Sequence, residues 1–324
     1  MGLEGLLLID GNDAYTTYRA VVVKGGHAGI LRWPSLKDVD TNDWHEYDGI
    51  EADLEAPVLD GREFDVDFYI FGKGKSQRLI DLIAALRDGS YHEMNFAVIG
   101  RTLKLRATSF KEPRLYSDGF GLTITFADDF PLNGYEYLEP SSQMTTYRDY
   151  LLDGVPFTDY GVRIIEGTLK SVINLPDVKP NLLRNISVVP GIIYDDPADD
   201  LEDDSEAEVD TTVRLSYKDV TLNCYLSASN STELWRNYDA LLYDLTRPGS
   251  RALLSRNTMQ QLECYYQSCE VERYALGHDG SVGVIFSINL KITGSTDITY
   301  LLAHEDERLI ITEEGKAMEV VFSF

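Results

Sequence analysis

The strongest constraint on this chain is an internal repeat. Two stretches of similar length carry the same signals in the same order, opening with Asp10-Gly11 in one and Asp153-Gly154 in the other. Residues 18–25 and 160–167 follow, and both have a leading Tyr, a run of branched apolar residues and a closing Gly. Each run predicts a short strand ended by glycine. The shared order predicts that one structural unit is present twice.

Each half then carries a strand of strict alternation followed by a helix. Period-two alternation indicates a strand with one buried face, and apolar residues at helical spacing indicate a helix packed on a core. Ser76 and Ser231 stand where helix caps belong, and Gly89 and Gly249 stop the two helices. The strands alternate at Phe64, Val66, Phe68 and Ile70 and at Val220, Leu222, Cys224 and Leu226, and the stripes are Leu79, Ile80, Ile83 and Leu86, then Leu234, Tyr238, Leu241, Leu242 and Leu245.

The closing signals of each half are also strands. Strands are predicted at 103–107 and 262–266, and Asp-Gly turns at 118–119 and 279–280 lead to alternating strands at 122–126 and 284–290. No helix–strand alternation long enough for a doubly wound sheet is present. The fold class is therefore mainly β with one helix per domain (α+β): two tandem β-sandwich or barrel domains, residues 1–140 and 141–295, and a small C-terminal β meander, residues 296–324.

Both halves contain a long polar insertion before the alternating strand. The first insertion spans residues 33–61 and the second spans 174–212. Segments of this length inside compact domains are usually functional or mobile. The second is rich in acids with almost no cations to pair them, which predicts a solvated loop. The meander is predicted from strands at 298–303, 308–312 and 318–322.

The charge of the chain restricts its partners. Acidic residues number 54 against 29 Lys plus Arg, and the formal net charge is -25. Such a surface repels nucleic acid and anionic membranes. Cys224, Cys264 and Cys269 are too few for a disulfide framework and are interpreted as core thiols in a reducing compartment. No apolar run reaches signal-peptide or membrane-spanning length, so we expect a soluble protein made without export.

One motif resembles a phosphate-binding loop. Gly72-Lys73-Gly74-Lys75-Ser76 lies between a strand and a helix and ends in Gly-Lys-Ser. A P-loop also needs a Gly five residues before Gly74, and Tyr69 stands there inside the alternating strand. The corresponding loop of the second half, Ser229-Asn230-Ser231, has no Lys. The position therefore predicts only a turn and a helix cap.

Metal and catalytic signals are also incomplete. Asp38, Asp40 and Asn42 match the first three ligands of an EF-hand loop, but Asp43 replaces the required Gly and Gly49 replaces the closing Glu. The five histidines show no ligand spacing, and no Gly-x-Ser-x-Gly elbow or pair of nucleophile and base stands out. The sequence thus predicts no catalytic, cofactor-binding or metal-binding residues, no cofactor and no enzymatic activity.

Aromatic residues gather in and around the first insertion. Trp33, Trp44, Tyr47 and Tyr69 are interpreted first as a small hydrophobic core, with stacking on sugars or on a neighbouring subunit as the alternatives. Trp235, on the second helix, is interpreted as a packing residue.

The first half resembles the N-terminal domain of distal tail proteins of long-tailed bacteriophages, which are related in fold to tail-tube and baseplate-hub domains. The resemblance rests on the order of the Leu-Ile-Asp-Gly opening at 8–11, the 18–25 run, the insertion, the 64–71 strand, the 76–87 helix, the 122–126 strand and Asp128-Asp129-Phe130-Pro131. It covers residues 5–132, and 150–293 more weakly. The second half departs from the usual distal tail protein, because it repeats the first instead of being a carbohydrate-binding-like domain.

The resemblance implies a structural protein of a phage or prophage tail: a ring of three or six chains that connects the tail tube to the tip or receptor-binding proteins. Genomic DNA would pass through without specific binding, which suits an acidic lumen. The expected location is the virion tail, assembled in the cytoplasm of the host bacterium. The alternative functions are a carbohydrate-binding or adhesion module of a β-sandwich protein and an enzyme with an unrecognised site, in that order.

Overall fold

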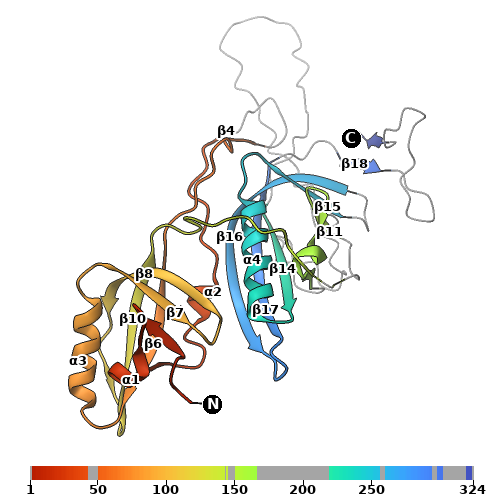
Figure 1. The fold of residues 1–324 in the computed structure, drawn as a ribbon. Coiled ribbons are helices and arrows are strands. Elements are labelled where there is room, and N and C mark those ends of the chain that lie inside the picture. Colours follow the sequence, from red (N-terminus) through yellow and green to blue (C-terminus); the bar gives the residue numbers. More distant parts are fainter. Residues whose placement is uncertain are drawn as a thin grey trace, which may run out of the picture.

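The computed structural model describes residues 2–42, 50–142, 144, 150–165, 219–255, 260–293, 298–301 and 319–322. Most of its regular structure is β-strand, in agreement with the predicted mainly β fold class. Two large antiparallel sheets lie side by side, one built from each half of the chain (Figure 1).

The first half forms one sheet with the strand order β2-β1-β7-β8-β10-β6-β3, and β9 adds to β10. The short strands β4 and β5 pair with each other inside the first insertion. The elements are β1 (Leu7–Ile9), β2 (Asn12–Asp13), α1 (Ala14–Tyr18), β3 (Ala20–Val22), α2 (Ala28–Leu31), β4 (Thr41–Asn42), β5 (Glu51–Ala52), β6 (Arg62–Phe71), α3 (Lys75–Leu86), β7 (Tyr91–Phe96), β8 (Arg101–Phe110), β9 (Arg114–Leu115) and β10 (Gly119–Asp128).

The second half forms a sheet with the strand order β12-β11-β15-β16-β17-β14-β13. A 3₁₀ turn, η1, stands where α1 stands in the first half. The elements are β11 (Tyr150–Leu152), β12 (Val155–Pro156), η1 (Phe157–Tyr160), β13 (Val162–Ile164), β14 (Asp219–Ala228), α4 (Ser231–Leu245), β15 (Arg251–Ser255), β16 (Gln260–Leu276) and β17 (Val282–Ile292).

The two sheets have the same topology. Without β4, β5 and β9, each half has seven strands, which can be numbered 1 to 7 along the chain. In both sheets these strands lie side by side in the order 2-1-5-6-7-4-3. A helix follows the fourth strand in each half, α3 in one and α4 in the other. In the described residues each half is one open sheet covered by a helix, where the sequence predicted a sandwich or barrel. The domain boundaries at 140 and 295 stay a prediction.

The predicted alternation fixes the core of each sheet. In β6, Val66, Phe68 and Ile70 are fully buried, and they pair across the ladder with residues of β10. In β14, Leu222 and Cys224 are fully buried and lie opposite Ile288 and Phe286 of β17. The intervening residues point to the other face of each sheet, which is polar, as expected for an antiparallel sheet with one face in water.

The two Asp-Gly turns share an unusual backbone. Asp10 and Asp153 have φ of 48° and 49°, and Gly11 and Gly154 have φ of 77° and 83°. Two successive residues with positive φ make the tight hairpin turn that Asp-Gly favours. The strands predicted at 18–25 and 160–167 begin later than expected, because the leading tyrosines end α1 and η1, and the paired residues of β3 and β13 number three each. Residues 166–167 lie outside the described residues.

The caps of the two long helices differ from the prediction. The side chain of Asn230, not of Ser231, caps α4, because its Oδ1 accepts a hydrogen bond from the Glu233 amide at 2.9 Å. Gly74 with φ 73° precedes α3, and no side chain caps that end. Ser76 lies within the first turn of α3, so its predicted capping role is wrong.

The C-terminal region is described in two strands. β18 (Ile298–Leu301) pairs antiparallel with β19 (Glu319–Phe322). The strand predicted at 308–312 lies outside the described residues, as does the second insertion, 174–212. In the described part of the chain, no helix combines the length and the apolar character needed to cross a membrane.

Candidate functional site: the contact between the halves

The first insertion leaves the first sheet and runs along the second (Figure 1). Its opening residue, Trp33, is only 3% exposed and lies among aromatic residues of the second half. The centre of its ring is 4.5 Å from that of Tyr238, 5.4 Å from Phe286 and 6.1 Å from Tyr266. Trp33 therefore completes the core of the half to which it does not belong.

Hydrogen bonds hold the insertion along this path. Tyrosine hydroxyls and backbone amides of one half donate to backbone carbonyls of the other, so polar groups buried in the contact are satisfied. The bonds are Tyr238 Oη to Leu31 O at 2.8 Å, Tyr266 Oη to Pro34 O at 2.8 Å, Leu36 N to Gln267 O at 2.9 Å, Ile50 N to Thr293 O at 2.9 Å and Gly249 N to Leu54 O at 2.8 Å.

A partly buried ion pair joins the first sheet to α4. Arg101, the first residue of β8, makes two hydrogen bonds to the carboxylate of Asp239, one of them Nη2 to Oδ1 at 3.1 Å. The Arg101 guanidinium also lies over the ring of Trp235 at 4.3 Å, and Trp235 Nε1 donates to Ile99 O at 2.6 Å. Burial raises the pKa of Asp239, and the charge of Arg101 opposes that rise.

A second ion pair fixes the start of the insertion. Arg62 and Asp128 face each other across the β6–β10 ladder, and Arg62 Nε lies 3.0 Å from Asp128 Oδ2. Arg62 Nη1 also donates to the carbonyls of Ile30, at 3.1 Å, and of Arg32. Burial lowers the pKa of Arg62, and the Asp128 carboxylate works against that effect. The pair therefore positions the backbone that delivers Trp33 to the second half.

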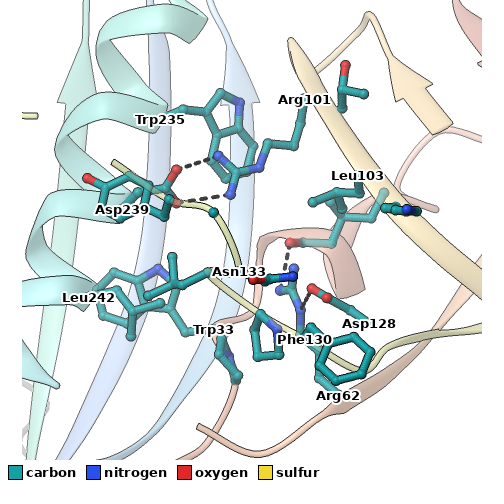
Figure 2. A pocket seen from close by; sticks show the side chains of 18 of the residues that line it. Trp33, Arg62, Arg101, Leu103, Asp128, Phe130, Asn133, Trp235, Asp239 and Leu242 are labelled. Atoms are coloured by element: carbon teal, nitrogen blue, oxygen red, sulfur yellow. Dashed lines mark hydrogen bonds and ion pairs between the residues drawn. The ribbon is translucent and has the colours of Figure 1, made fainter. Parts of the chain in front are cut away.

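A pocket of about 490 Å³ lies in the same contact (Figure 2). Its walls come from α4, from β8 and from the segment that follows β10, and both ion pairs border it. Trp33 Nε1 and Tyr135 Oη lie on its lining and have no hydrogen-bond partner in the described structure. The pocket thus mixes aromatic and aliphatic walls with two ion pairs, and two of its lining residues carry a buried polar atom without a partner.

The aromatic residues of the first insertion do not form one group. Trp33 is buried in the second half, whereas Tyr69 stacks on Phe71 and lies against Tyr116. Trp44 and Tyr47 lie outside the described residues. Because Trp33 is enclosed by protein, it offers no open face on which a sugar could stack, and the carbohydrate-binding alternative loses that residue.

The loop that resembles a phosphate-binding motif is used internally. Lys75 Nζ donates to the carbonyls of Tyr116 at 3.3 Å and Ser117 at 3.1 Å, so it holds the turn before β10. The three cysteines are buried and unpaired. No group of three or more potential ligands that could hold a metal ion occurs among the described residues.

The structure brings together one set of residues that the sequence did not connect. His92 Nδ1 lies 2.7 Å from Asp10 Oδ2, and His92 Nε2 lies 3.3 Å from Ser90 Oγ. This order resembles a hydrolase triad, but Ser90 Oγ lies closer to the Asp88 carboxylate, at 2.8 Å, than to His92. The hydroxyl proton is therefore directed to Asp88, away from the base. The set ties the β1–β2 turn to β7.

The sequence does not predict which residues build the contact between the halves, although one of them carries a partial signal. Asp239 lies within the apolar stripe of its helix, between Tyr238 and Leu242, where a charged residue needs a partner. Its partner, Arg101, is 138 positions earlier in the chain and has no pattern that marks it. Trp235 is a packing residue as predicted, but it packs on the first half.

No family model matches the chain, and no curated protein matches it. One solved structure that aligns with it is the crystal structure of the SPP1 Dit protein (gp 19.1), described as a paradigm of the hub adsorption apparatus in phages that infect Gram-positive hosts. The alignment covers 88% of this chain and 97% of that one at 10% identity, with a TM-score of 0.30. An alignment at this TM-score does not establish a shared fold.

Proposed function

We propose that the chain is a structural protein of a bacteriophage or prophage tail, a distal tail or baseplate-hub component that assembles into a ring. In this proposal the two sheets are tandem copies of one domain, residues 1–140 and 141–295. Three or six chains close the ring, which joins the tail tube to the tip or receptor-binding proteins. The protein acts as a scaffold and has no catalytic role.

The observation that carries the proposal is the repeated strand order together with the contact between the halves. The first half and the second half use different surfaces in this contact, so the contact is head-to-tail. Head-to-tail contacts between like units build rings when the rotation closes. A chain with two units already contains one such contact.

The polar faces of the sheets suit a passage for DNA. On the first sheet, Asp65 and Asp67 stand on the face opposite the core and bind the hydroxyls of Thr125 and Thr123 at 2.7 and 2.5 Å. On the second, Thr221 and Asn289 bind each other at 2.7 Å. Lys111 pairs with Asp65 on the first of these faces, so its positive charge is matched within the sheet. We assign these faces to the lumen, where acids and hydroxyls let a polyanion pass without binding.

The test is the state of the purified full chain over a range of concentrations. Light scattering coupled to gel filtration should give a mass of three or six chains, and negative-stain images should show rings with an open centre. A monomer at the highest concentration reached would overturn the proposal. Binding of double-stranded DNA to the assembled ring at low salt would contradict the assignment of the acidic faces to the lumen.

A further inference from the structure

The segment that connects β10 to the second half contains a reactive pair of residues. The sequence has a single Asn-Gly dipeptide, Asn133-Gly134, and it lies in this segment. An asparagine side chain can react with the main chain when glycine follows it, because the two groups are already close and glycine has no Cβ to hinder the approach. Whether the pair reacts in a folded chain depends on the groups that surround it.

The main chain is bonded on both sides of this pair but not at the atom that would react. Asn133 N donates to Phe130 O at 3.1 Å, and Tyr135 N donates to Leu132 O at 3.0 Å. Between these bonds, the amide of Gly134 has no hydrogen-bond partner among the described residues. The turn is therefore held in place while the Gly134 nitrogen stays free to act as a nucleophile.

The asparagine side chain is free as well. Asn133 and Gly134 are both exposed, and the Asn133 amide makes no hydrogen bond in the part of the chain that the structure describes. A Cβ placed on Gly134 would meet nothing within 4 Å, so there is open space for a ring to form. Other asparagines are engaged: Asn230 accepts from the amide of Glu233, and both polar atoms of the Asn237 side chain are bonded.

We propose that Asn133 and Gly134 form a self-modification site, at which the chain converts its own asparagine to isoaspartate with water as the co-reactant. The Gly134 nitrogen attacks Cγ of Asn133, the bond between Cγ and Nδ2 breaks, and Nδ2 leaves as ammonia together with the Gly134 amide proton. Water then opens the cyclic imide. Cleavage between Gly134 N and Cγ gives aspartate, whereas cleavage between Gly134 N and the main-chain carbonyl carbon gives isoaspartate. No atom is oxidised or reduced.

The position of the site gives the reaction a consequence for the contact between the halves. Asn133 lines the pocket in that contact (Figure 2). In isoaspartate the main chain runs through Cγ, so the connecting segment becomes longer by one atom. The hydrogen bond from Tyr135 N to Leu132 O spans the lengthened stretch and loses its geometry. The ring of Tyr135 packs on Tyr243 of α4 with 5.8 Å between the ring centres, so the change loosens the segment from the second half.

The test follows the full chain and its Asn133→Gln variant during storage in mildly alkaline buffer. Mass spectrometry of the digested protein, with fragmentation that separates isoaspartate from aspartate, should find isoaspartate at position 133 while Asn230 and Asn237 stay intact. Glutamine keeps an exposed amide but must close a larger ring, so Asn133→Gln should react at that position more slowly by about tenfold or more. A synthetic peptide of residues 128–138 gives the rate without the fold. Conversion of the peptide with none at position 133 of the folded chain would overturn the proposal.

A second measurement tests the effect on the contact. Converted protein should have a lower urea midpoint than fresh protein, and stored Asn133→Gln should keep its midpoint. Asn133→Asp carries the new charge without the additional main-chain atom, so its midpoint should fall less than that of the converted chain. An unchanged midpoint in fully converted protein would overturn the effect on the contact. Neither measurement depends on ring formation, so failure here leaves the proposed function standing.

Discussion

Replacement of Trp33 tests whether the two halves share one core. Trp33 belongs to the first insertion but is 3% exposed against Tyr238, Phe286 and Tyr266 of the second half. Truncation of a buried large aromatic residue costs about 3–5 kcal/mol, because the transfer free energy is lost and a cavity remains. We expect Trp33→Ala to lower the free energy of unfolding by that amount, and to lower Tm by roughly 6–12 °C.

The loss in free energy of unfolding should depend on the aromatic ring of Trp33 and not on its indole N–H. Trp33 Nε1 has no hydrogen-bond partner in the described structure, so Trp33→Phe removes a buried unsatisfied donor as well as some volume. We expect that variant to lose about 1–2 kcal/mol, clearly less than the alanine variant.

Urea unfolding followed by circular dichroism measures these differences. Leu115→Ala is the control, because Leu115 is 71% exposed and should change the free energy of unfolding by no more than about 0.5 kcal/mol. The wild-type chain should unfold in one transition seen equally by far-UV and near-UV signals. A loss below about 1 kcal/mol for Trp33→Ala would refute the shared core.

Three further predictions concern particular contacts. Arg101→Ala should lower the free energy of unfolding measured in urea by about 3–5 kcal/mol, because Asp239 stays buried without its partner. This loss of stability should shrink toward low pH, because the Asp239 carboxyl then takes up a proton. A double variant with leucine at both positions should recover most of the lost stability. Burial raises the pKa of Asp10, but the hydrogen bonds from His92 and from the Glu93 amide together outweigh this and leave the pKa below 3.8. The contribution of Asp10 to stability is therefore present above pH 3.8 and is lost as the pH falls through the lower folded value; Asp10→Asn should flatten the acid side of the urea midpoint–pH curve, and an unchanged curve would contradict this. Gly29→Ala should cost about 1–3 kcal/mol in thermal unfolding, since a Cβ there would lie 2.5 Å from Phe64 Cβ, and an unchanged Tm would count against that close approach.

The sequence predicted the elements whose signals are local. Alternation in β6 and β14 and the helical spacing in α3 and α4 placed the strands and helices correctly, because a buried face imposes its period on nearby residues. The stripe predicted for α3 is wrong at Ile80, which is 56% exposed, whereas Leu82 is fully buried. The Asp-Gly turns were equally readable, since positive φ at Asp10 and Asp153 is a property of two or three residues. These signals sufficed to predict that the halves repeat the same order.

The contact between the halves could not be predicted in this way. Tyr238 reaches Leu31 across 207 positions and Tyr266 reaches Pro34 across 232, and no periodicity records which residues meet at such separations. Closeness in sequence groups Trp33 with the aromatic residues of the first insertion, whereas its neighbours in space, such as Tyr238, lie in the second half. The caps were misassigned for a related reason: Ser231 and Asn230 are both good caps, and only the backbone geometry selects between them.

The hydrogen bonds from Tyr238 and Tyr266 to the start of the first insertion also bear on synthesis of the protein. When a ribosome has made the first 140 residues, the indole of Trp33 has nothing to cover it, because its surroundings are encoded more than 200 positions later. The apolar side chain of Trp33 therefore stays exposed in the nascent chain until α4, β16 and β17 leave the ribosome. Folding of the first insertion is thus completed only after the second half has been translated, and a nascent chain that stops before α4 would leave Trp33 exposed and would aggregate.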